Sequence, residues 1–338
     1  MRILLVTDAW RPQLNGVVRT LEHLRDDLAA LGHETRVIHP GLFRSCGCPT
    51  YPEIRLSLNA PWAIGRLLRE AKPDAIHLAT EGPLGLCTRR WCLRHRIPFT
   101  TAFHTLFPEY IQKRFGIPVG IGYAWLRRFH GAAARTMVAT PSLRDDLARR
   151  GFRNLVYWSR GVDTELFHPR PKTALDLPRP IFLFGGRIAV EKNLEAFLKL
   201  DLPGSKVVVG DGPDLRMLRG RYPEAHFLGA KEGDDLAQAF AAADVFVFPS
   251  RTDTFGLVLL EAMASGVPVA AYPVMGPRDV VKHGVTGILD EDLGRAALAA
   301  QGLSAQACRE HALGYSWQAC ARQFLGHVIQ VQDITASA

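Results

Sequence analysis

Short apolar runs alternate with amphipathic stretches along the first half of the chain. Residues 3–7 form an apolar, β-rich run, and residues 17–31 then carry apolar positions at helical spacing up to Gly32, a common helix terminator. A strand, a helix and a second strand in this order form the repeating unit of a parallel sheet. The alternation continues with strands predicted at 36–38, 75–78, 99–102, 137–140 and 155–157, and with helices predicted near 60–71 and 84–95.

A proline-rich segment divides the chain. Residues 161–180 contain four prolines and no sustained periodicity, which is typical of a linker. With 338 residues, the chain also exceeds the usual size of a single core. A second series of apolar runs follows the linker, at residues 181–184, 206–209, 226–228, 245–248 and 267–270.

The two series predict an α/β protein with two doubly wound domains. We expect the first domain over residues 1–165, the second over 166–314, and a helix and tail at 315–338 that pack back toward the first domain. Ligands of such sheets bind beyond the carboxyl ends of the strands, so the loops at those ends are the candidate sites.

The charge is divided unevenly between the two halves. The whole chain carries a net charge of +8, but residues 1–170 hold 25 Lys and Arg against 14 Asp and Glu, a net charge of +11. Such an excess favours nucleic acid, an anionic membrane surface or an anionic substrate as partner, with an ordinary solvated Arg-rich surface as the alternative. Cations alternate with aromatic and aliphatic groups at residues 89–96, 113–115 and 125–130, as in interfacial segments, unless the aromatic rings face the core.

The N-terminal apolar run is far shorter than a signal-peptide core, and no run approaches the roughly 18 to 20 apolar residues of a membrane span. We therefore expect a cytoplasmic location, with peripheral attachment to the inner face of a membrane as a further expectation. The six cysteines lack paired zinc spacing, so we expect reduced thiols and no metal site.

Two loops that follow predicted strands carry groups suited to phosphate. Gly16 stands at the start of the first predicted helix, where free backbone N–H groups can approach an anion, although a turn glycine is the simpler explanation. The loop lacks the GxGxxG spacing of a dinucleotide dehydrogenase. Arg187 and Lys192 flank the loop after the first strand of the second domain and can neutralise a diphosphate. Gly212 belongs to VGDGP, a loop able to lie close to a nucleobase or to form a plain tight turn.

The segment PSRTDTFGLVLLEAMASG is the most specific in the chain. It places Asp253 at a strand end and Glu261 after seven intervening residues, on either side of a predicted helix start. One acid can hold sugar hydroxyls and the other a ribose diol, while the helix N-terminus favours phosphates between them. Two acids that are merely exposed on a helix are the alternative.

Taken together, TDAWRPQLNGVVRTL, GVDTELFHP, the GR…EKN loop, VGDGP and the acid-x(7)-Glu segment resemble the family 4 retaining glycosyltransferases of GT-B fold, over nearly the whole chain. FHTLFPEY at 103–110 is similar to the branch with sulfoquinovosyl-diacylglycerol synthases, GDP-mannose-dependent mannosyltransferases and bacterial diacylglycerol glycosyltransferases. The resemblance implies two Rossmann-like domains facing a central cleft. It implies His104, Asp253 and Glu261 as catalytic residues; Gly16, Arg187, Lys192, Gly212, Phe255, Gly256 and Leu257 as donor-binding residues; and Trp10, Glu109 and Tyr110 as acceptor-binding residues.

The resemblance implies that His104 contacts the transferred sugar; the alternative is a structural histidine held by hydrogen bonds. The first acid departs from the family pattern, because Asp253 stands where Glu is usual. The shorter side chain changes the reach toward the sugar and leaves the donor sugar open. No DxD motif accompanies the cations, so we expect no cofactor and metal-independent chemistry.

The expected activity is front-face, retaining transfer of a hexose or hexuronic acid from a nucleotide-sugar, with UDP favoured and GDP the alternative. The expected acceptor is a lipid such as diacylglycerol at an anionic membrane surface, giving an α-glycoside; nucleic acid has no role in this scheme, and the oligomeric state is left open. The alternatives are a mannosyl- or glucosyltransferase with a soluble or polysaccharide acceptor, an epimerase or phosphorylase of the same fold, a dehydrogenase, and a non-catalytic binding module.

Overall fold

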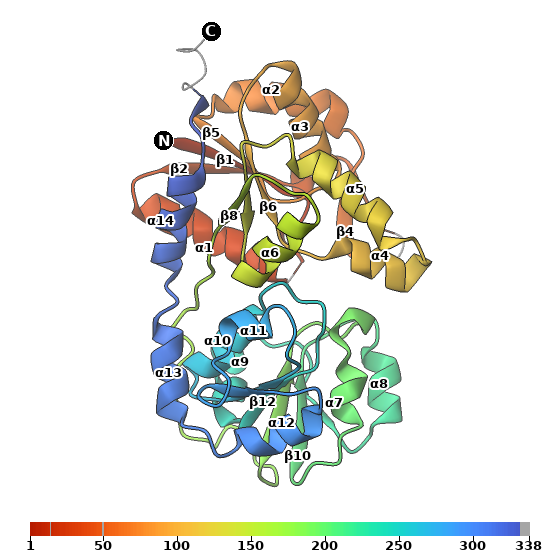
Figure 1. The fold of residues 1–338 in the computed structure, drawn as a ribbon, viewed down its shortest axis with the longest axis vertical. Coiled ribbons are helices and arrows are strands. Elements are labelled where there is room, and N and C mark those ends of the chain that lie inside the picture. The colour runs from red at the N-terminus through yellow and green to blue at the C-terminus, as the bar shows by residue number, and fades with distance from the viewer. Residues whose placement is uncertain (14, 49–50, 332–338) are drawn as a thin grey trace. The chain divides into compact units, whose positions relative to one another are not determined.

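A computed structural model describes residues 1–13, 15–48 and 51–331. The chain divides into two compact units, the first comprising Met1–Ser159 and the chain from Trp317 onward, the second comprising Arg160–Ser316 (Figure 1). The contacts place the boundaries after Ser159 and Ser316, where the sequence predicts them after residues 165 and 314. Among the described residues, no helix has the length and apolar character needed to span a bilayer.

The first unit is built on a parallel sheet in the strand order β2-β1-β5-β6-β7-β8. The inner strands β1 and β5 pair in register from Ile3 with Ala75 to Val6 with Leu78, and these residues are buried. Burial on both faces explains why these strands appear in the sequence as continuous apolar runs. Their bounds are β1 Arg2–Val6, β2 Glu34–Ile38, β5 Ala75–Leu78, β6 Thr100–Phe103, β7 Arg135–Val138 and β8 Leu155–Tyr157.

Helices cover this sheet, and α1 begins where the sequence predicts because Asn15 caps it. The Asn15 side chain accepts hydrogen bonds from the backbone N–H groups of Val17 and Val18. A hairpin of β3 Ser45–Cys48 and β4 Tyr51–Ser57, which the apolar pattern does not predict, lies outside the main sheet. The helices are α1 Gly16–Ala30, α2 Ala60–Ala71, α3 Pro83–Arg94, α4 Phe107–Phe115, α5 Val119–His130 and α6 Pro141–Arg149, with a 3-10 turn η1 at Pro40–Leu42.

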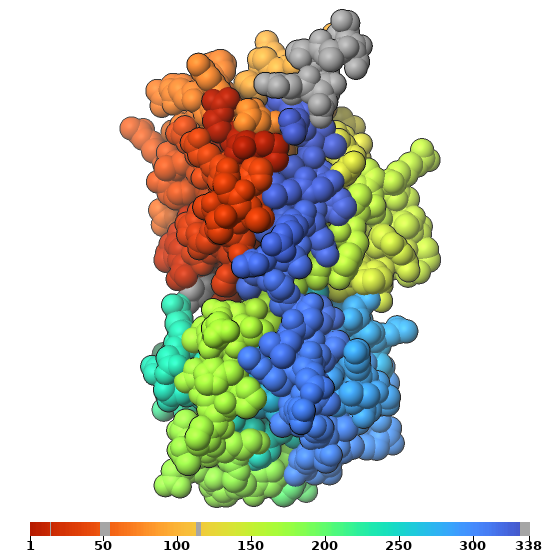
Figure 2. Space-filling model, turned by 90° about the vertical axis from the view of Figure 1, so that its left-hand side faces the viewer, coloured from red at the N-terminus to blue at the C-terminus, as the bar shows by residue number. Residues whose placement is uncertain are grey.

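The C-terminal helix α14, Trp317–His327, completes the core of the first unit. Figure 2 shows its blue surface beside the red N-terminal elements. Phe324 is fully buried in a cluster with Leu21 and Trp158, and the Trp158 Nε1–H donates to the carbonyl oxygen of Cys320 at 3.1 Å. Because these contacts remove large apolar groups from water, α14 stabilises the first unit.

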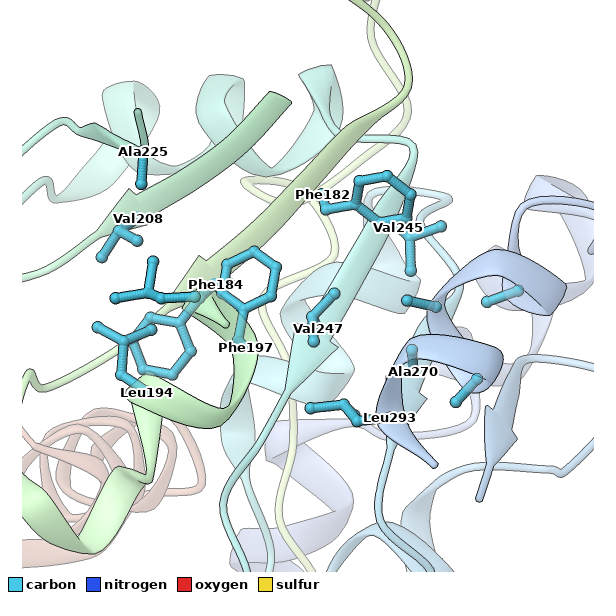
Figure 3. Close-up of a cluster of buried hydrophobic side chains, with 14 of the residues drawn as sticks. Phe182, Phe184, Leu194, Phe197, Val208, Ala225, Val245, Val247, Ala270 and Leu293 are labelled. Atoms are coloured by element: carbon cyan, nitrogen blue, oxygen red, sulfur yellow. The ribbon is translucent and has the colours of Figure 1, made fainter. Parts of the chain in front are cut away.

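The second unit repeats the design with the order β11-β10-β9-β12-β13-β14. Phe182, Phe184 and Phe197 pack against Val245 and Val247 at its centre (Figure 3). The strands are β9 Ile181–Gly185, β10 Ser205–Val209, β11 His226–Phe227, β12 Val245–Phe248, β13 Val269–Ala271 and the unpredicted edge strand β14 Gly287–Leu289. The helices are η2 Val190–Lys192, α7 Leu194–Leu198, α8 Leu215–Arg221, α9 Gly233–Ala242, α10 Leu257–Ala264, α11 Pro277–Val280, α12 Leu293–Ala300 and α13 Ala305–Leu313.

The proline-rich segment 161–180, predicted to be a linker, is bound to the second unit. Phe167 is buried and lies edge-on to Phe240 at 5.8 Å between ring centroids. Asp244 receives hydrogen bonds from the Arg179 guanidinium at 3.1 Å and from the backbone N–H of Ile181 at 2.7 Å. Prolines interrupt the periodicity here, but side chains on either side of them anchor the segment.

We predict that Phe324→Ala lowers the free energy of unfolding of the first unit by about 3–5 kcal/mol, because it leaves a cavity in a closed core. All six tryptophans of the chain lie in the first unit, so urea denaturation followed by tryptophan fluorescence reports on that unit. The control is Arg322→Ala on the exposed side of the same helix, with an expected change within about 0.5 kcal/mol. Equal stabilities of the two variants would contradict the role given to α14.

Candidate functional site

The carboxyl edge of the second sheet is shaped by two loops whose backbones touch. At the ends of β9 and β10, the backbone N–H of Gly186 donates to the carbonyl oxygen of Val209 at 2.9 Å. The backbone N–H of Ile188 donates to the carbonyl oxygen of Asp211 at 2.8 Å. Gly210 and Gly212 have φ values of 146° and 158°, and a Cβ at either position would overlap a backbone carbonyl oxygen of Gly186 or Ile188. Glycine is therefore required at these positions by chain packing, which accounts for Gly212 without a ligand.

Lys192 and Asp253 form an ion pair at this edge. The Lys192 Nζ lies 2.5 Å from the Asp253 Oδ1, and the two side chains are only 23% and 16% exposed. The other carboxylate oxygen, Oδ2 of Asp253, is buried and has no hydrogen-bond partner among the described residues. A buried carboxylate oxygen normally accepts a hydrogen bond, so this atom has an unused capacity to accept one.

Hydrogen bonds between two loops hold this pair in place. The Asn193 side-chain amide donates to the carbonyl oxygen of Pro249 at 3.0 Å, and the Thr252 hydroxyl donates to that of Glu191 at 3.3 Å. Lys192 lies in the first of these loops, at the end of η2, and Asp253 lies in the second, beyond β12. Both charged groups are thus supported by backbone on either side, which limits their freedom.

The acid-x(7)-Glu segment forms the start of α10, much as its sequence predicts. Gly256 is the N-cap with φ 86°, and a Cβ there would press on Leu259 and Phe248. Leu257 opens the helix and is half-buried, while Phe255 is buried and lies edge-on to the Tyr315 ring at 6.4 Å. Glu261, on the second turn of α10, is buried, with 7% of its surface exposed.

Arg187 and Gly276 also lie at this edge of the second sheet. Arg187 follows β9 directly, between the backbone contacts of Gly186 and Ile188, and is half-buried. Gly276, which the sequence did not suggest, has φ 87°, and a Cβ there would meet the carbonyl oxygen of Asp253 at 2.7 Å. The signal that could have found it is a Gly-Pro pair shortly after an apolar strand, the position of a strand-end loop.

The carboxyl edge of the first sheet carries a buried acid that the motifs also missed. Asp8 follows β1, and its carboxylate accepts hydrogen bonds from the Thr80 hydroxyl at 2.9 Å and from the N–H groups of Leu84 at 2.9 Å and Gly85 at 3.3 Å. Burial raises the pKa of the Asp8 carboxyl above its ordinary value, although these hydrogen bonds act in the opposite direction. Asp8 thereby supplies the N-terminus of α3 with acceptors from a distant segment.

The first loop places Gly16 at the first position of α1. Asn15 accepts from two of the N–H groups at this helix start, at 3.0 Å each, so the side-chain cap already uses part of the predicted anion site. Trp10, in the same loop, is half-buried and stacks on His39 with 5.7 Å between ring centroids.

Three predicted residues follow β6: His104 in the loop after the strand, and Glu109 and Tyr110 in α4. His104 is half-buried and lies edge-on to Trp158 at 6.0 Å. Glu109, in the first turn of α4, accepts a hydrogen bond from the Tyr123 hydroxyl at 2.7 Å. Burial, followed by this hydrogen bond, raises the pKa of Tyr123 above its ordinary value. Glu109 therefore joins α4 to α5, and Tyr110 beside it contacts the Phe107 ring at 6.5 Å.

The predicted residues thus fall into two sets, one in each unit. The set in the second unit contains a direct contact, Lys192 with Asp253, between residues that the sequence assigned separate tasks. The first set comprises Trp10, Gly16, His104, Glu109 and Tyr110, and the second comprises Arg187, Lys192, Gly212, Asp253, Phe255, Gly256, Leu257 and Glu261.

Comparisons with known proteins match both units. Residues 14–166 match the model of Glycosyltransferase Family 4, and residues 179–305 match Glycosyl transferases group 1. Sucrose-phosphate synthase from Thermosynechococcus elongatus shares the fold, with a TM-score of 0.80 at 21% identity and full coverage of both chains. The architecture is that of the GT-B glycosyltransferases, with two Rossmann-like domains, and the protein is an enzyme of this class.

Its relatives define the family more closely. A GDP-mannose-dependent alpha-mannosyltransferase from Mycobacterium tuberculosis is 33% identical, over 97% of this chain and 96% of that protein. The sulfoquinovosyl transferase SQD2 of Arabidopsis thaliana is 36% identical over 73% of this chain and 52% of its own length. The alpha-monoglucosyldiacylglycerol synthase of Acholeplasma laidlawii is 26% identical over 80% and 79%. The chain belongs to family 4 of the glycosyltransferases, which confirms the resemblance found in its motifs.

We predict energetic coupling between Lys192 and Asp253. The Lys192→Met and Asp253→Asn variants and their combination form a double-mutant cycle in the free energy of unfolding, measured by urea and far-UV circular dichroism. We expect a coupling energy of about 1–3 kcal/mol, because each single variant removes the charge-assisted hydrogen bond between two partly buried side chains. Additive effects within about 0.3 kcal/mol would show that the pair does not stabilise the loops.

Proposed function

We propose that this enzyme transfers a hexose from a nucleotide-sugar to a membrane lipid and retains the anomeric configuration, so that the product is an α-glycoside. The observation that carries the proposal is the Lys192–Asp253 pair with its spare carboxylate oxygen. A cation beside an acceptor with unused capacity suits a ligand that brings both negative charge and hydroxyl groups. A nucleotide-sugar has both.

In this proposal the donor completes the hydrogen bonding of Asp253. A sugar hydroxyl donates to Oδ2, the buried oxygen without a partner, while Oδ1 remains on Lys192. An unmade hydrogen bond of a buried charged group costs about 1–3 kcal/mol, so a donor hydroxyl at this point recovers free energy on binding. Glu261, buried on the second turn of α10, accepts from the ribose diol.

Arg187 and Lys192 neutralise the charge that develops on the departing nucleoside diphosphate. Electrostatic groups that are already in place act most strongly where charge grows in the transition state. The acceptor hydroxyl attacks on the face from which the diphosphate leaves, and its proton passes to the leaving phosphate oxygen, so no protein nucleophile takes part. In keeping with this arrangement, we propose that catalysis needs no metal ion.

The remaining residues support binding. Gly212, Phe255, Gly256 and Leu257 shape the loops around the donor. Gly16 contacts a donor phosphate, and His104 positions the transferred sugar. Trp10 and Tyr110 are proposed to contact the acceptor, whereas Glu109, committed to Tyr123, acts by holding α4.

For the donor, GDP-mannose is favoured over a UDP-sugar. The mannosyltransferase relative that aligns over nearly the full length of both proteins is named for GDP-mannose. We therefore favour GDP-mannose over the UDP-sugar expected from the sequence. For the acceptor, a diacylglycerol-type lipid is supported by the name of the Acholeplasma relative and by the net charge of +11 over residues 1–170. A soluble or polysaccharide acceptor is the alternative.

We predict that Arg187→Ala, Lys192→Ala and Glu261→Gln each lower kcat by at least about tenfold, because each removes an interaction that strengthens as the diphosphate leaves. Initial rates of the purified variants at saturating donor provide the measurement. Lys199→Ala is the matched control, since Lys199 is 64% exposed and lies outside the site, and its rate should equal that of the unmodified enzyme. Two of the three variants within twofold of that rate would overturn the site assignment.

A donor and acceptor screen tests the activity itself. GDP-mannose, UDP-glucose and UDP-galactose are each offered with diacylglycerol and with soluble mannosides, and the products are identified by mass spectrometry and by the anomeric coupling constant. We expect an α-mannosyl lipid, formed equally with and without EDTA. Transfer to soluble sugars alone would reject the lipid acceptor, a β-glycoside would reject retention, and loss of activity with EDTA would reject metal independence.

A further inference from the structure

Two neighbouring helices of the first unit expose large apolar groups beside cations. On α3, Leu86 and Leu93 are 41% and 46% exposed, and Arg90 is exposed between them. On α5, Ile121 and Trp125 are 63% and 44% exposed, and Arg128 follows on the same side. We call these residues the α3–α5 face: Leu86, Arg90, Leu93, Ile121, Trp125 and Arg128.

The helical phase of α5 separates this face from the core. Tyr123, Leu126 and Phe129 are buried and repeat at intervals of three, whereas Ile121, Trp125 and Arg128 repeat at four and three on the opposite side. Since the inner side already packs against the unit, the outer apolar groups have no role in the core.

Arg89 of α3 links the two helices through hydrogen bonds to α5. The Arg89 guanidinium donates to the carbonyl oxygens of Phe129 at 3.0 Å and Arg128 at 2.8 Å, at the C-terminal end of α5. It also lies 5.9 Å from the centroid of the Phe129 ring, on which Trp125 stacks at 6.0 Å. Arg89 therefore ties α3 to the C-terminal end of α5, and Figure 1 shows the two helices as neighbours in the first unit.

The charge of this surface has a single sign. Neither α3 nor α5 contains an Asp or Glu, while together they contain the cations Arg89, Arg90, Arg94, Arg127 and Arg128. The side chains of Arg90 and Arg128 make no hydrogen bond or ion pair with the described residues, whereas Arg89 and Arg127 donate to backbone carbonyls.

This arrangement corrects the interfacial segments predicted from the sequence. Within 89–96 and 125–130, Cys92, Leu126, Phe129 and His130 are buried and cannot meet a partner. The side chains of 113–115 lie outside the described residues. Ile121, absent from those segments, is instead among the most exposed apolar groups of the unit.

We infer that the α3–α5 face docks on the surface of an anionic bilayer. Ile121 and Trp125 enter the headgroup layer, and Arg90 and Arg128 pair with lipid phosphates. The inference deepens the proposed function, on whose lipid acceptor it rests. A single-stranded nucleic acid needs a series of aromatic platforms, and this face offers one indole among aliphatic groups, so a bilayer fits the surface better.

The test is co-sedimentation of the full chain with vesicles, without donor. Phosphatidylcholine vesicles containing phosphatidylglycerol should bind the protein, and pure phosphatidylcholine vesicles should bind it at least about tenfold more weakly. Ile121→Ser with Trp125→Ala, and Arg90→Glu with Arg128→Glu, should each weaken binding at least about tenfold, while unchanged circular dichroism spectra show that the variants fold. Raising the salt concentration should weaken the binding of the unmodified protein.

Two matched controls locate the contact. Arg216→Glu with Met217→Ser makes the same kind of change on the exposed side of α8 in the second unit, and should bind as the unmodified protein does. Trp62→Ala removes an 81% exposed indole from α2 and should also leave binding intact. Loss of binding in Trp62→Ala, with retention in both α3–α5 variants, would move the contact to α2 and overturn the inference.

Activity separates this inference from the proposed function. The α3–α5 variants should glycosylate short-chain diacylglycerol in detergent micelles at the normal rate and lose activity on vesicles. Failure of the unmodified protein to bind anionic vesicles, or equal binding to homopolymeric RNA, would overturn the docking face even if micellar lipid is glycosylated. Vesicle binding without any lipid product would overturn the proposed acceptor and leave the docking face standing.

Discussion

A backbone contact that admits no side chain shapes the functional edge of the second unit. Gly210 and Gly212 lie against the carbonyl groups of Gly186 and Ile188, so the loop after β9 continues beside the loop after β10. Arg187 stands between these contacts, and the chain leaves them to form η2, which ends at Lys192. The position of both cations therefore depends on two residues without side chains. A larger residue at Gly210 or Gly212 would displace the loop that carries both cations, although it would change no charge.

Much of the fold could be predicted because parallel strands buried on both faces appear as unbroken apolar runs. The inner strands of both sheets occur within two residues of their predicted bounds. The β3–β4 hairpin could not be predicted, since neither of its strands is an unbroken apolar run, and the edge strand β14 spans only three residues. The proline-rich segment 161–180 was predicted only as a linker, and its attachment to the second unit could not be predicted because its anchors, such as Arg179 on Asp244, join residues 65 apart in the sequence.

The candidate site was predictable as a set of residue types at strand ends, but not as a set of contacts. Lys192 and Asp253 are 61 residues apart, and motif spacing carries no record of their pairing. Asp8 was missed for the same reason, since its partners lie 72 to 77 residues later. The alternation of cations and aromatic residues in α5 is visible in the sequence, but the sequence does not show which of these residues face the solvent. Only the helical phase in the folded chain shows that Phe129 is core and Ile121 is surface.

The place of α14 has a consequence for the order of assembly during synthesis. The first unit takes Cys320 and Phe324 into its core, so its closing residues leave the ribosome after the whole of the second unit. Residues 160–316 are contiguous and can close their own core as soon as they emerge, because domains generally fold as units. Until then the apolar groups that pack around Phe324, among them Leu21 and Trp158, are exposed to the solvent or to a chaperone. In this enzyme the domain that is begun first is the domain that is finished last.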